Sequence, residues 1–198
     1  MLSDLTNHTR VLDYMEMITL GVIGDTHIPD RTSHLHPGIV PLFHKARVQA
    51  ILHTGDICVR EVLTWLEEIA PVFAVRGNRD WLALRELPLN RELAFGGVTI
   101  GLTHGHGGWR QYIIDKPYYL FYEYQHERLF PRLLSTFQTA QAIVFGHGHL
   151  PLNTMLDGKL LFNPGFPVRQ NKKKIAPTVG LLHINGRSEI SGRLVELD

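Results

Sequence analysis

The residues of this sequence that could do chemistry are seven metal-binding side chains, each placed just after a short apolar run. In chain order they are Asp25, His27, Asp56, Asn78, His104, His147 and His149. Each lies in or beside a short polar turn, usually with a glycine, which lets the backbone bend sharply. An aspartate that closes a turn and a single structural histidine are both common, so the interpretation depends on all seven together. Carboxylate, amide and imidazole donors suit divalent Mn, Fe, Ni, Co and Zn.

The number and spacing of these donors predict two ions rather than one. Seven protein ligands exceed what one ion needs if it is also to keep an open position for water. Asp25 and His27 are two residues apart, as are His147 and His149, and such side chains on an extended turn can point to the same side. A carboxylate has two oxygens, so Asp56 is the candidate bridge. We expect two divalent transition-metal ions as cofactors, with manganese the first to test.

The apolar runs before these residues predict the elements that position them. Buried strands are expected at residues 18–23, 50–52, 72–75, 98–102 and 142–145. Helices are expected at 38–50 and 59–69, and alternation of strand and helix implies parallel neighbouring strands. Asp157-Gly158 and Asn185-Gly186 predict hairpins that join 152–156 to 159–162 and 178–184 to 188–194. The pattern therefore predicts an α/β fold with two packed mixed β-sheets flanked by helices.

The segment 108–138 departs from this rhythm and contains five of the six tyrosines, at positions 112, 118, 119, 122 and 124. It is expected to be helical, with breaks at Pro117 and Pro131. We favour two helices that pack on a sheet over a lid that faces the substrate or a dimer surface.

Length and composition restrict the class of protein. With 198 residues we expect one domain at 18–198, after an extension at 1–17 that is either native or the result of a wrongly assigned start. The formal net charge of +1 gives no strong attraction to nucleic acid or to an anionic membrane. The single cysteine, Cys58, excludes an internal disulfide and a cysteine-based zinc cluster. Because no apolar run approaches the roughly 20 residues of a membrane helix, we expect a cytoplasmic protein.

The motifs form an ordered set: Asp-x-His, Gly-Asp, Gly-Asn-x-Asp, His and Gly-His-x-His. In this the sequence resembles the calcineurin-like metallophosphoesterases, and among them the small phosphodiesterases of the YfcE type, from residue 18 to about residue 169. The resemblance implies a four-layer αββα sandwich and attack on phosphorus by a hydroxide between the ions. It assigns one ion to Asp25, His27, Asp56 and His149, and the other to Asp56, Asn78, His104 and His147.

The sequence also differs from the family pattern. Arg79 stands where many members of the wider superfamily have a histidine, and an arginine stays protonated and cannot donate a proton usefully. His106 is the other candidate for proton transfer, with a hydrogen bond to a metal ligand as the alternative. We therefore expect Arg79, Asp80 and His106 to act in catalysis. The residues expected to contact substrate are Asn78, Arg79, Asn163 and Gly165.

Two further features have open interpretations. Phe166 follows Asn163-Pro164-Gly165 where the family usually has serine, which leaves the contact of that hydroxyl in doubt. The basic residues Arg169 and 172–174 form a stretch for which a solvated loop is favoured over attraction of an anionic substrate. No role is assigned to six of the histidines outside the motifs: His34, His36, His44, His53, His126 and His183.

The sequence allows three classes of function to be weighed by their chemical needs. We expect a phosphodiesterase whose partner is a small phosphate ester with a good leaving group. A phosphomonoesterase or nucleotidase is the alternative. A non-catalytic scaffold is the second class, because a eukaryotic coat subunit of the retromer resembles this fold, but a scaffold has no chemical need for seven donors. A nuclease is disfavoured by the short chain and nearly neutral charge. Membrane and nucleic-acid partners are not expected, and a homo-oligomer is left open.

Overall fold

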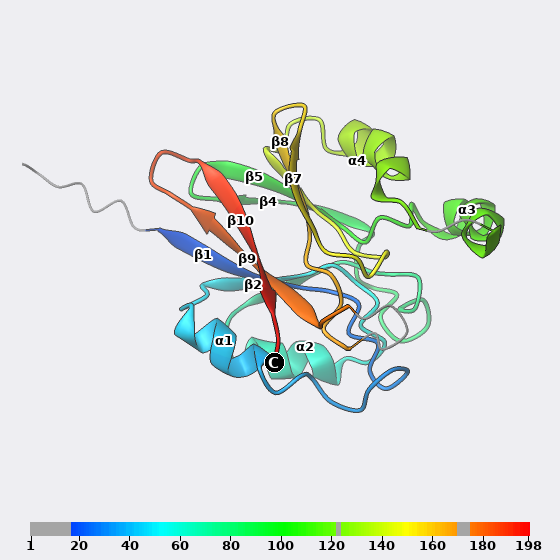
Figure 1. Cartoon of the computed structure of the whole chain (residues 1–198), viewed down its shortest axis with the longest axis horizontal. Helices are drawn as coiled ribbons and strands as arrows, with labels where there is room; N and C mark the ends of the chain where they lie inside the picture. The colour runs from blue at the N-terminus through cyan, green and yellow to red at the C-terminus, as the bar shows by residue number, and fades with distance from the viewer. Residues whose placement is uncertain (1–16, 122–123, 170–174) are drawn as a thin grey trace, which may run out of the picture.

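The computed structural model describes residues 17–121, 124–169 and 175–198. Residues 1–16 of the expected extension at 1–17, Tyr122 and the basic residues 172–174 lie outside the described residues. The described strands form two five-stranded sheets that face one another (Figure 1).

The first sheet has the order β10-β9-β1-β2-β3. Strands β1 (Ile18–Ile23), β2 (Ala50–His53) and β3 (Val72–Ala74), the last at the edge of the sheet, are parallel, as the strand and helix alternation predicted. Strands β9 (Thr178–Ile184) and β10 (Ile190–Glu196) form an antiparallel hairpin, and β9 pairs antiparallel with β1. The sheet is therefore mixed, and the three loops that follow its parallel strands lie together at the carboxyl ends of those strands.

The second sheet has the order β4-β5-β6-β8-β7. Strands β5 (Val98–Thr103), β6 (Ala142–Val144) and β8 (Lys159–Asn163) are parallel. The outer strands β4 (Asn90–Phe95) and β7 (Leu152–Leu156) pair antiparallel with β5 and β8. This sheet therefore delivers the loops after β5, β6 and β8 to one edge as well.

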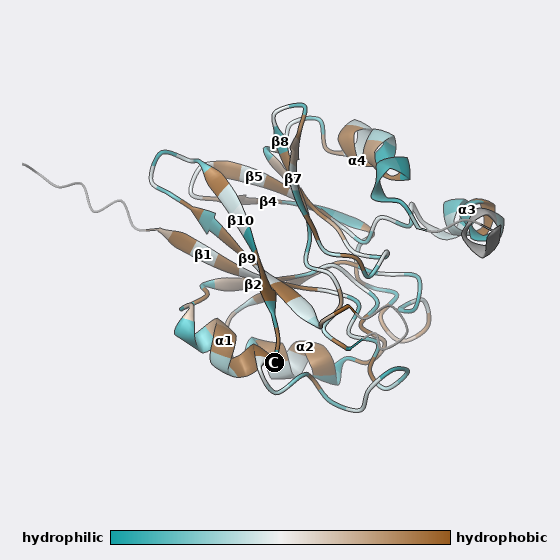
Figure 2. Cartoon of the chain, viewed as in Figure 1, coloured by the Kyte–Doolittle hydropathy of each residue, from teal (hydrophilic) through white to brown (hydrophobic). Residues whose placement is uncertain are grey.

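Apolar side chains divide the molecule into four layers. Along β2 the side chain of Ile51 packs with helices α1 (Ile39–Lys45) and α2 (Glu61–Glu67), while Ala50 and Leu52 pack between the sheets, because successive side chains point to opposite faces of a strand. Helix α4 (Phe130–Thr136) packs on the outer face of the second sheet. Figure 2 shows hydrophobic segments along β1, β5 and β9 and along α1 and α2. The predicted sandwich of two mixed sheets flanked by helices is confirmed.

The segment 108–138 differs from its prediction. Helix α3 (Trp109–Phe121) continues through Pro117, so the expected break there is wrong. Pro131 occupies the first turn of α4, where a missing N–H leaves no intrahelical hydrogen bond unmade, and it starts that helix instead of breaking it. A 3-10 turn, η1 (His126–Arg128), precedes α4. Figure 1 shows α3 set apart from both sheets, so only α4 packs on a sheet as expected.

The two predicted hairpins differ from each other. Asp157 and Gly158 form a two-residue turn, and both have positive φ, as the Asp-Gly pair predicted. The loop at 185–189 is longer, because Asn185 N–H donates to Glu189 O at 3.0 Å, so the last strand begins at residue 190 and not at 188. Among the described residues, no helix is long and apolar enough to cross a membrane.

Candidate metal centre

The loops that carry the predicted donors are joined to one another by backbone hydrogen bonds. Asp25 N–H donates to Gly55 O at 2.8 Å, and His27 N–H donates to Asp56 O at 3.0 Å, so the loop after β1 lies along the loop after β2. Across the two sheets, His104 Nδ1 lies 2.8 Å from Thr54 O. Because the carboxyl ends of these strands meet at one edge of the sandwich, donors far apart in sequence become neighbours.

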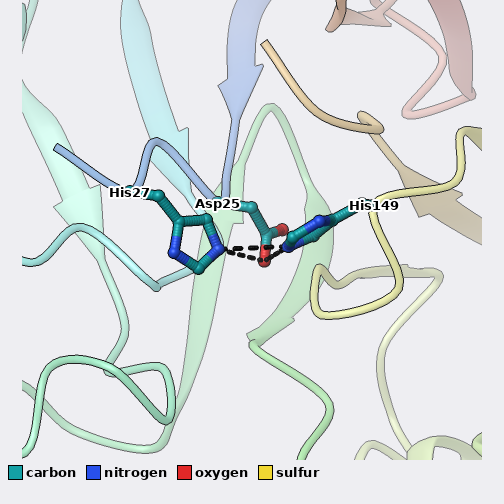
Figure 3. A group of neighbouring side chains, drawn as sticks. All are labelled: Asp25, His27 and His149. Carbon is teal, nitrogen blue, oxygen red and sulfur yellow. Dashed lines mark hydrogen bonds and ion pairs between the residues drawn. The ribbon is translucent and has the colours of Figure 1, made fainter. Parts of the chain in front are cut away.

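The first group of donors consists of Asp25, His27 and His149 (Figure 3). One ligand atom from each lies within 4.8 Å of the others. His149 Nε2 is 3.3 Å from Asp25 Oδ1, and the Nε2 atoms of His27 and His149 are 3.1 Å apart. Asp25 is fully buried and His27 almost so, while His149 is partly exposed. Two imidazole nitrogens therefore face one buried carboxylate, as ligands of a common ion would.

The second group lies on the other side of Asp56. His104 Nε2 is 3.6 Å from Asp56 Oδ1 and 3.2 Å from Asn78 Oδ1. The other oxygen of Asp56, Oδ2, is 3.5 Å from His27 Nε2. The imidazole of His147 lies beside that of His104, with ring centroids 5.1 Å apart. The carboxylate of Asp56 thus has one oxygen toward each group, which is the position that a bridging ligand requires.

Asp80 holds the two loops on which Asp56 and Asn78 stand. Its Oδ2 accepts from the N–H groups of Asp56 and Gly77, at 2.9 and 2.7 Å. Its Oδ1 accepts from Ile57 and Cys58 N–H, both at 2.8 Å. Asp80 is fully buried, and both of its oxygens are used by the backbone of neighbouring loops. This geometry suits a positioning residue more than one that contacts the reacting atoms.

Five of the seven donors have a left-handed backbone. Positive φ angles of 48–75° occur at Asp25, His27, Asp56, His147 and His149. Residues other than glycine rarely adopt this conformation, and it occurs most often at functional sites. Gly77 is required for a different reason, because a β-carbon there would overlap the backbone N and carboxylate of Asp56. The chain therefore bends most sharply where the donors are presented.

Burial and neighbouring charges shift the pKa values of the two central carboxyl groups in opposite directions. Burial, with the negative charge of Asp25 nearby, raises the pKa of Asp56 to about 6, although His104 opposes this shift. Burial would also raise the pKa of Asp25, but the attraction of His149, His104 and His27 lowers it below its usual range. A divalent cation beside Asp56 would compensate the charge that burial disfavours.

The histidines of the centre are mainly in the neutral form that binds metals. Burial lowers the pKa of His27 to about 4, of His106 to about 3, and of His147 well below its usual value. Burial acts in the same direction on His104, but Asp56 and Asp25 outweigh it and raise its pKa. A neutral imidazole has a nitrogen lone pair available at neutral pH, so protons compete little for most of these ligands.

Aromatic rings contact the two partly exposed histidines of the site, His147 and His149. Phe166 stacks on His149 with ring centroids 4.4 Å apart and an interplanar angle of 7°. Tyr124 contacts His147 edge to face at 6.1 Å. The sequence offered little indication of these contacts, because an aromatic residue in a loop has no specific metal chemistry. Phe166 stands where the family usually has serine, and its contact with His149 follows from the fold.

The other residues expected to act on substrate lie in different surroundings. The half-exposed guanidinium of Arg79 is 3.6 Å from Asp30, and Arg79 N–H donates to Asp56 Oδ1 at 2.8 Å. Asn163 is fully buried, and its side chain bonds to Gly146 O and to the N–H of Gly165, both at 2.9 Å. These bonds shape the loop after β8. Of the expected substrate contacts, Arg79 is thus the most accessible.

One histidine without an assigned role contacts the two loops that carry Asp25 and Asp56. His53 ends β2 and is fully buried, with Nδ1 accepting from Gly55 N–H at 3.1 Å and Nε2 3.4 Å from Thr26 Oγ1. It therefore fixes the turn that carries Asp56 and the loop that carries Asp25. Burial lowers its pKa to about 4, so it is neutral at neutral pH.

The donor set fits two divalent ions. The imidazole nitrogens of His27, His104 and His149 each lie within 4.0 Å of a carboxylate oxygen of the buried Asp25 or Asp56. Asp25, Asp56 and His104 also lie close enough together to hold one ion, and they share Asp25 with the group of Asp25, His27 and His149. Oxygen and imidazole donors in this number suit first-row transition metals, which the geometry does not distinguish.

Comparison with known proteins assigns the family. The model of the calcineurin-like phosphoesterase superfamily domain matches residues 18–187. A probable metallophosphoesterase from Methanothermobacter thermautotrophicus is 33% identical over 167 residues, which are 84% of this chain and 86% of that protein.

Two solved structures share the fold. Vacuolar Protein Sorting 29 from Cryptosporidium parvum matches with a TM-score of 0.69 at 20% identity, over 92% of this chain and 98% of that one. An archaeal protein described as a phosphodiesterase matches with a TM-score of 0.62 at 18% identity, over 90% and 100%. With the family model and the archaeal relative, these findings show that the chain belongs to the calcineurin-like phosphoesterase superfamily.

Proposed function

We propose that this protein is a phosphodiesterase that depends on two divalent transition-metal ions, with manganese as the first candidate. The observation that carries the proposal is the position of Asp56, which has one carboxylate oxygen toward His27 and the other toward His104. Asp25, His27, Asp56 and His149 would hold one ion, and Asp56, Asn78, His104 and His147 the other. The family supports hydrolysis of a phosphate ester; the preference for diesters is our inference.

The residues of the chain have distinct tasks in this proposal. When bound, the ions would supply activated water and neutralise charge on the phosphoryl oxygens. Asp56 holds the two groups of donors in register, and Asp80 holds the loop of Asp56 against that of Asn78. Phe166 and Tyr124 keep the partly exposed histidines oriented. Preorganised charge of this kind acts without rearrangement during the reaction.

The absence of a suitable proton donor at Arg79 and His106 favours substrates with good leaving groups. Arg79 remains protonated, so we assign it stabilisation of charge on the phosphoryl group or the leaving oxygen. Burial lowers the pKa of His106 to about 3, so it is neutral at neutral pH and cannot serve there as an acid. We expect Arg79→Ala to lower the rate more for diesters with poor leaving groups than for activated ones.

Metal analysis and a substrate screen test this function. After reconstitution with Mn²⁺, the protein should hold two ions per chain and hydrolyse bis(p-nitrophenyl) phosphate faster than p-nitrophenyl phosphate. Faster turnover of the monoester would favour the alternative of a phosphomonoesterase or nucleotidase. A metal content near zero, or binding without hydrolysis of any ester, would support a scaffold, the other alternative that the fold of Vacuolar Protein Sorting 29 suggests.

A further inference from the structure

A half-buried tryptophan and an exposed one meet beside the candidate metal centre. Trp81 follows Asp80 directly in the loop that carries Asn78, and Trp109 is the first residue of α3. Their ring centroids are 6.1 Å apart, and the planes are tilted by 41°. Trp109 is 56% exposed and the neighbouring Leu82 is 94% exposed, so the pair is not part of a closed core. Large aromatic residues exposed in this way commonly mark a binding surface.

The same helix reaches the metal centre. Tyr112 lies three residues after Trp109 in α3, and residues at this spacing share a helix face. Its ring centroid is 6.2 Å from that of His147, a proposed metal ligand. The first turn of α3 therefore connects the loop of Asn78 with the loop of His147. We call Trp81, Trp109 and Tyr112 the aromatic rim.

One cationic group contacts the aromatic rim, and a second precedes it closely in sequence. The Nζ of Lys116 is 5.9 Å from the ring centroid of Tyr112. The guanidinium of Arg79, two residues before Trp81, is half exposed. Asp115, an acidic residue of the same helix, is already bound to Arg132 at 3.3 Å and to Gln111 at 2.9 Å. Flat rings combined with positive charges suit an anion that carries a planar group.

We infer that the aromatic rim binds a planar aromatic group of the substrate, a nucleobase or an aryl ring, while the metal centre holds its phosphate. The inference rests on the proposed function and specifies its substrate class. Stacking accounts for the exposure of Trp109 better than a purely structural contact between Trp81 and Trp109 does, since a structural contact would gain more from burial. Stacking on a ring face tolerates different bases, so the rim sets a class of substrate and not one compound.

Binding of three phosphate monoesters to the Mn²⁺-loaded protein tests the inference without relying on turnover. AMP, phenyl phosphate and ribose 5-phosphate present the same phosphate group with a nucleobase, an aryl ring or no planar ring. Calorimetry should give AMP an affinity roughly 5- to 150-fold higher than ribose 5-phosphate, the equivalent of one stacked base at about 1–3 kcal/mol. An affinity for phenyl phosphate equal to that for AMP would indicate that the rim accepts any aryl ring. A lower affinity for phenyl phosphate would indicate that it prefers a nucleobase. If released inorganic phosphate shows that a monoester is consumed, KM values replace affinities.

Variants separate stacking from a structural role. Trp109→Ala should reduce the advantage of AMP over ribose 5-phosphate to less than about 3-fold, whereas Trp109→Phe should retain most of it. Ile114→Ala is the matched control, because Ile114 is 68% exposed on the same helix and outside the rim. AMP should also quench tryptophan fluorescence in the wild type, which does not depend on any variant folding correctly.

Equal affinities for AMP and ribose 5-phosphate in the wild type would overturn the inference and leave the proposed function intact. An AMP advantage that survives both Trp81→Ala and Trp109→Ala would also overturn it. If none of the three probes binds to the Mn²⁺-loaded protein, the inference fails, whereas the proposed function is decided by the metal content and by hydrolysis of bis(p-nitrophenyl) phosphate.

Discussion

Replacing Asp56 by asparagine is expected to stabilise the metal-free protein while abolishing hydrolysis. Burial raises the pKa of Asp56 from its ordinary 3.8 to about 6, so the folded protein holds this proton more strongly than the unfolded chain. The associated stability is present below pH 3.8 and is lost as the pH rises through 6. At about 1.4 kcal/mol per pH unit, the loss at pH 7.5 is about 3 kcal/mol.

An asparagine is uncharged and keeps the oxygen that accepts from Arg79 N–H at 2.8 Å. The variant also loses the attraction between Asp56 and His104, which reduces the gain. We therefore expect Asp56→Asn to raise the free energy of unfolding by roughly 1–3 kcal/mol at pH 7.5. The gain should disappear near pH 3.5, where the wild-type carboxyl is neutral as well.

Urea unfolding in the presence of a chelator, at both pH values, measures this difference. Asp157→Asn is the matched control, because it makes the same chemical change at an exposed turn and should alter stability by less than about 0.5 kcal/mol. Saturating Mn²⁺ should then reverse the order, since metal binding to the wild type adds roughly 3 kcal/mol at a hundredfold excess over Kd. Loss of more than about 1 kcal/mol in metal-free Asp56→Asn would refute the argument from the buried charge.

Three further variants test the supporting residues. Asp80→Asn leaves two of the four backbone N–H groups without an acceptor, so urea unfolding should show a loss of roughly 2–5 kcal/mol; an unchanged midpoint would exclude this role. Phe166→Ala removes the ring stacked on His149, and metal titration should show one ion weakened roughly 10- to 100-fold; equal weakening of both ions would contradict this. The pKa of His53 is about 4 in the folded protein, so the unfolded chain binds the proton first, and the free energy of unfolding should fall by about 3 kcal/mol between pH 6.5 and pH 4. His53→Gln should flatten that part of the profile of unfolding free energy against pH; parallel profiles for the two proteins would disprove this.

The strands that lead to the site could be predicted because their sequences are apolar on both faces. All positions of β2 are buried, and such a run is recognisable in the sequence. Strand β4 was missed because exposed residues alternate with half-buried ones along it, and because it depends on pairing with β5. The helix through Pro117 was also missed, since local steric preference predicts a break there. Edge strands and tolerated prolines depend on tertiary context that local patterns do not contain.

The candidate ligands could be predicted from residue type and position, but their supports could not. Each donor follows a strand and has side-chain atoms suited to a metal, and both properties are written in the sequence. Asp80 has the same side chain as Asp25 and Asp56, yet its oxygens are bound by four backbone N–H groups from two loops. Its role is therefore decided by neighbours that are 3 to 24 residues away.

The left-handed backbone at five donors implies that the centre is locally strained in the absence of metal. Glycine would adopt these φ angles without strain, but it has no donor atom, so the strain at each of these residues, about 1–3 kcal/mol, must be balanced by surrounding contacts. The hydrogen bonds from Asp25 N–H to Gly55 O and from His27 N–H to Asp56 O are among these contacts. Metal binding would add further restraint, so hydrogen exchange at Asp25 and His27 should slow on addition of Mn²⁺ more than exchange at the β9–β10 hairpin. Equal slowing throughout would mean that metal stabilises the whole fold and that the centre holds no particular strain.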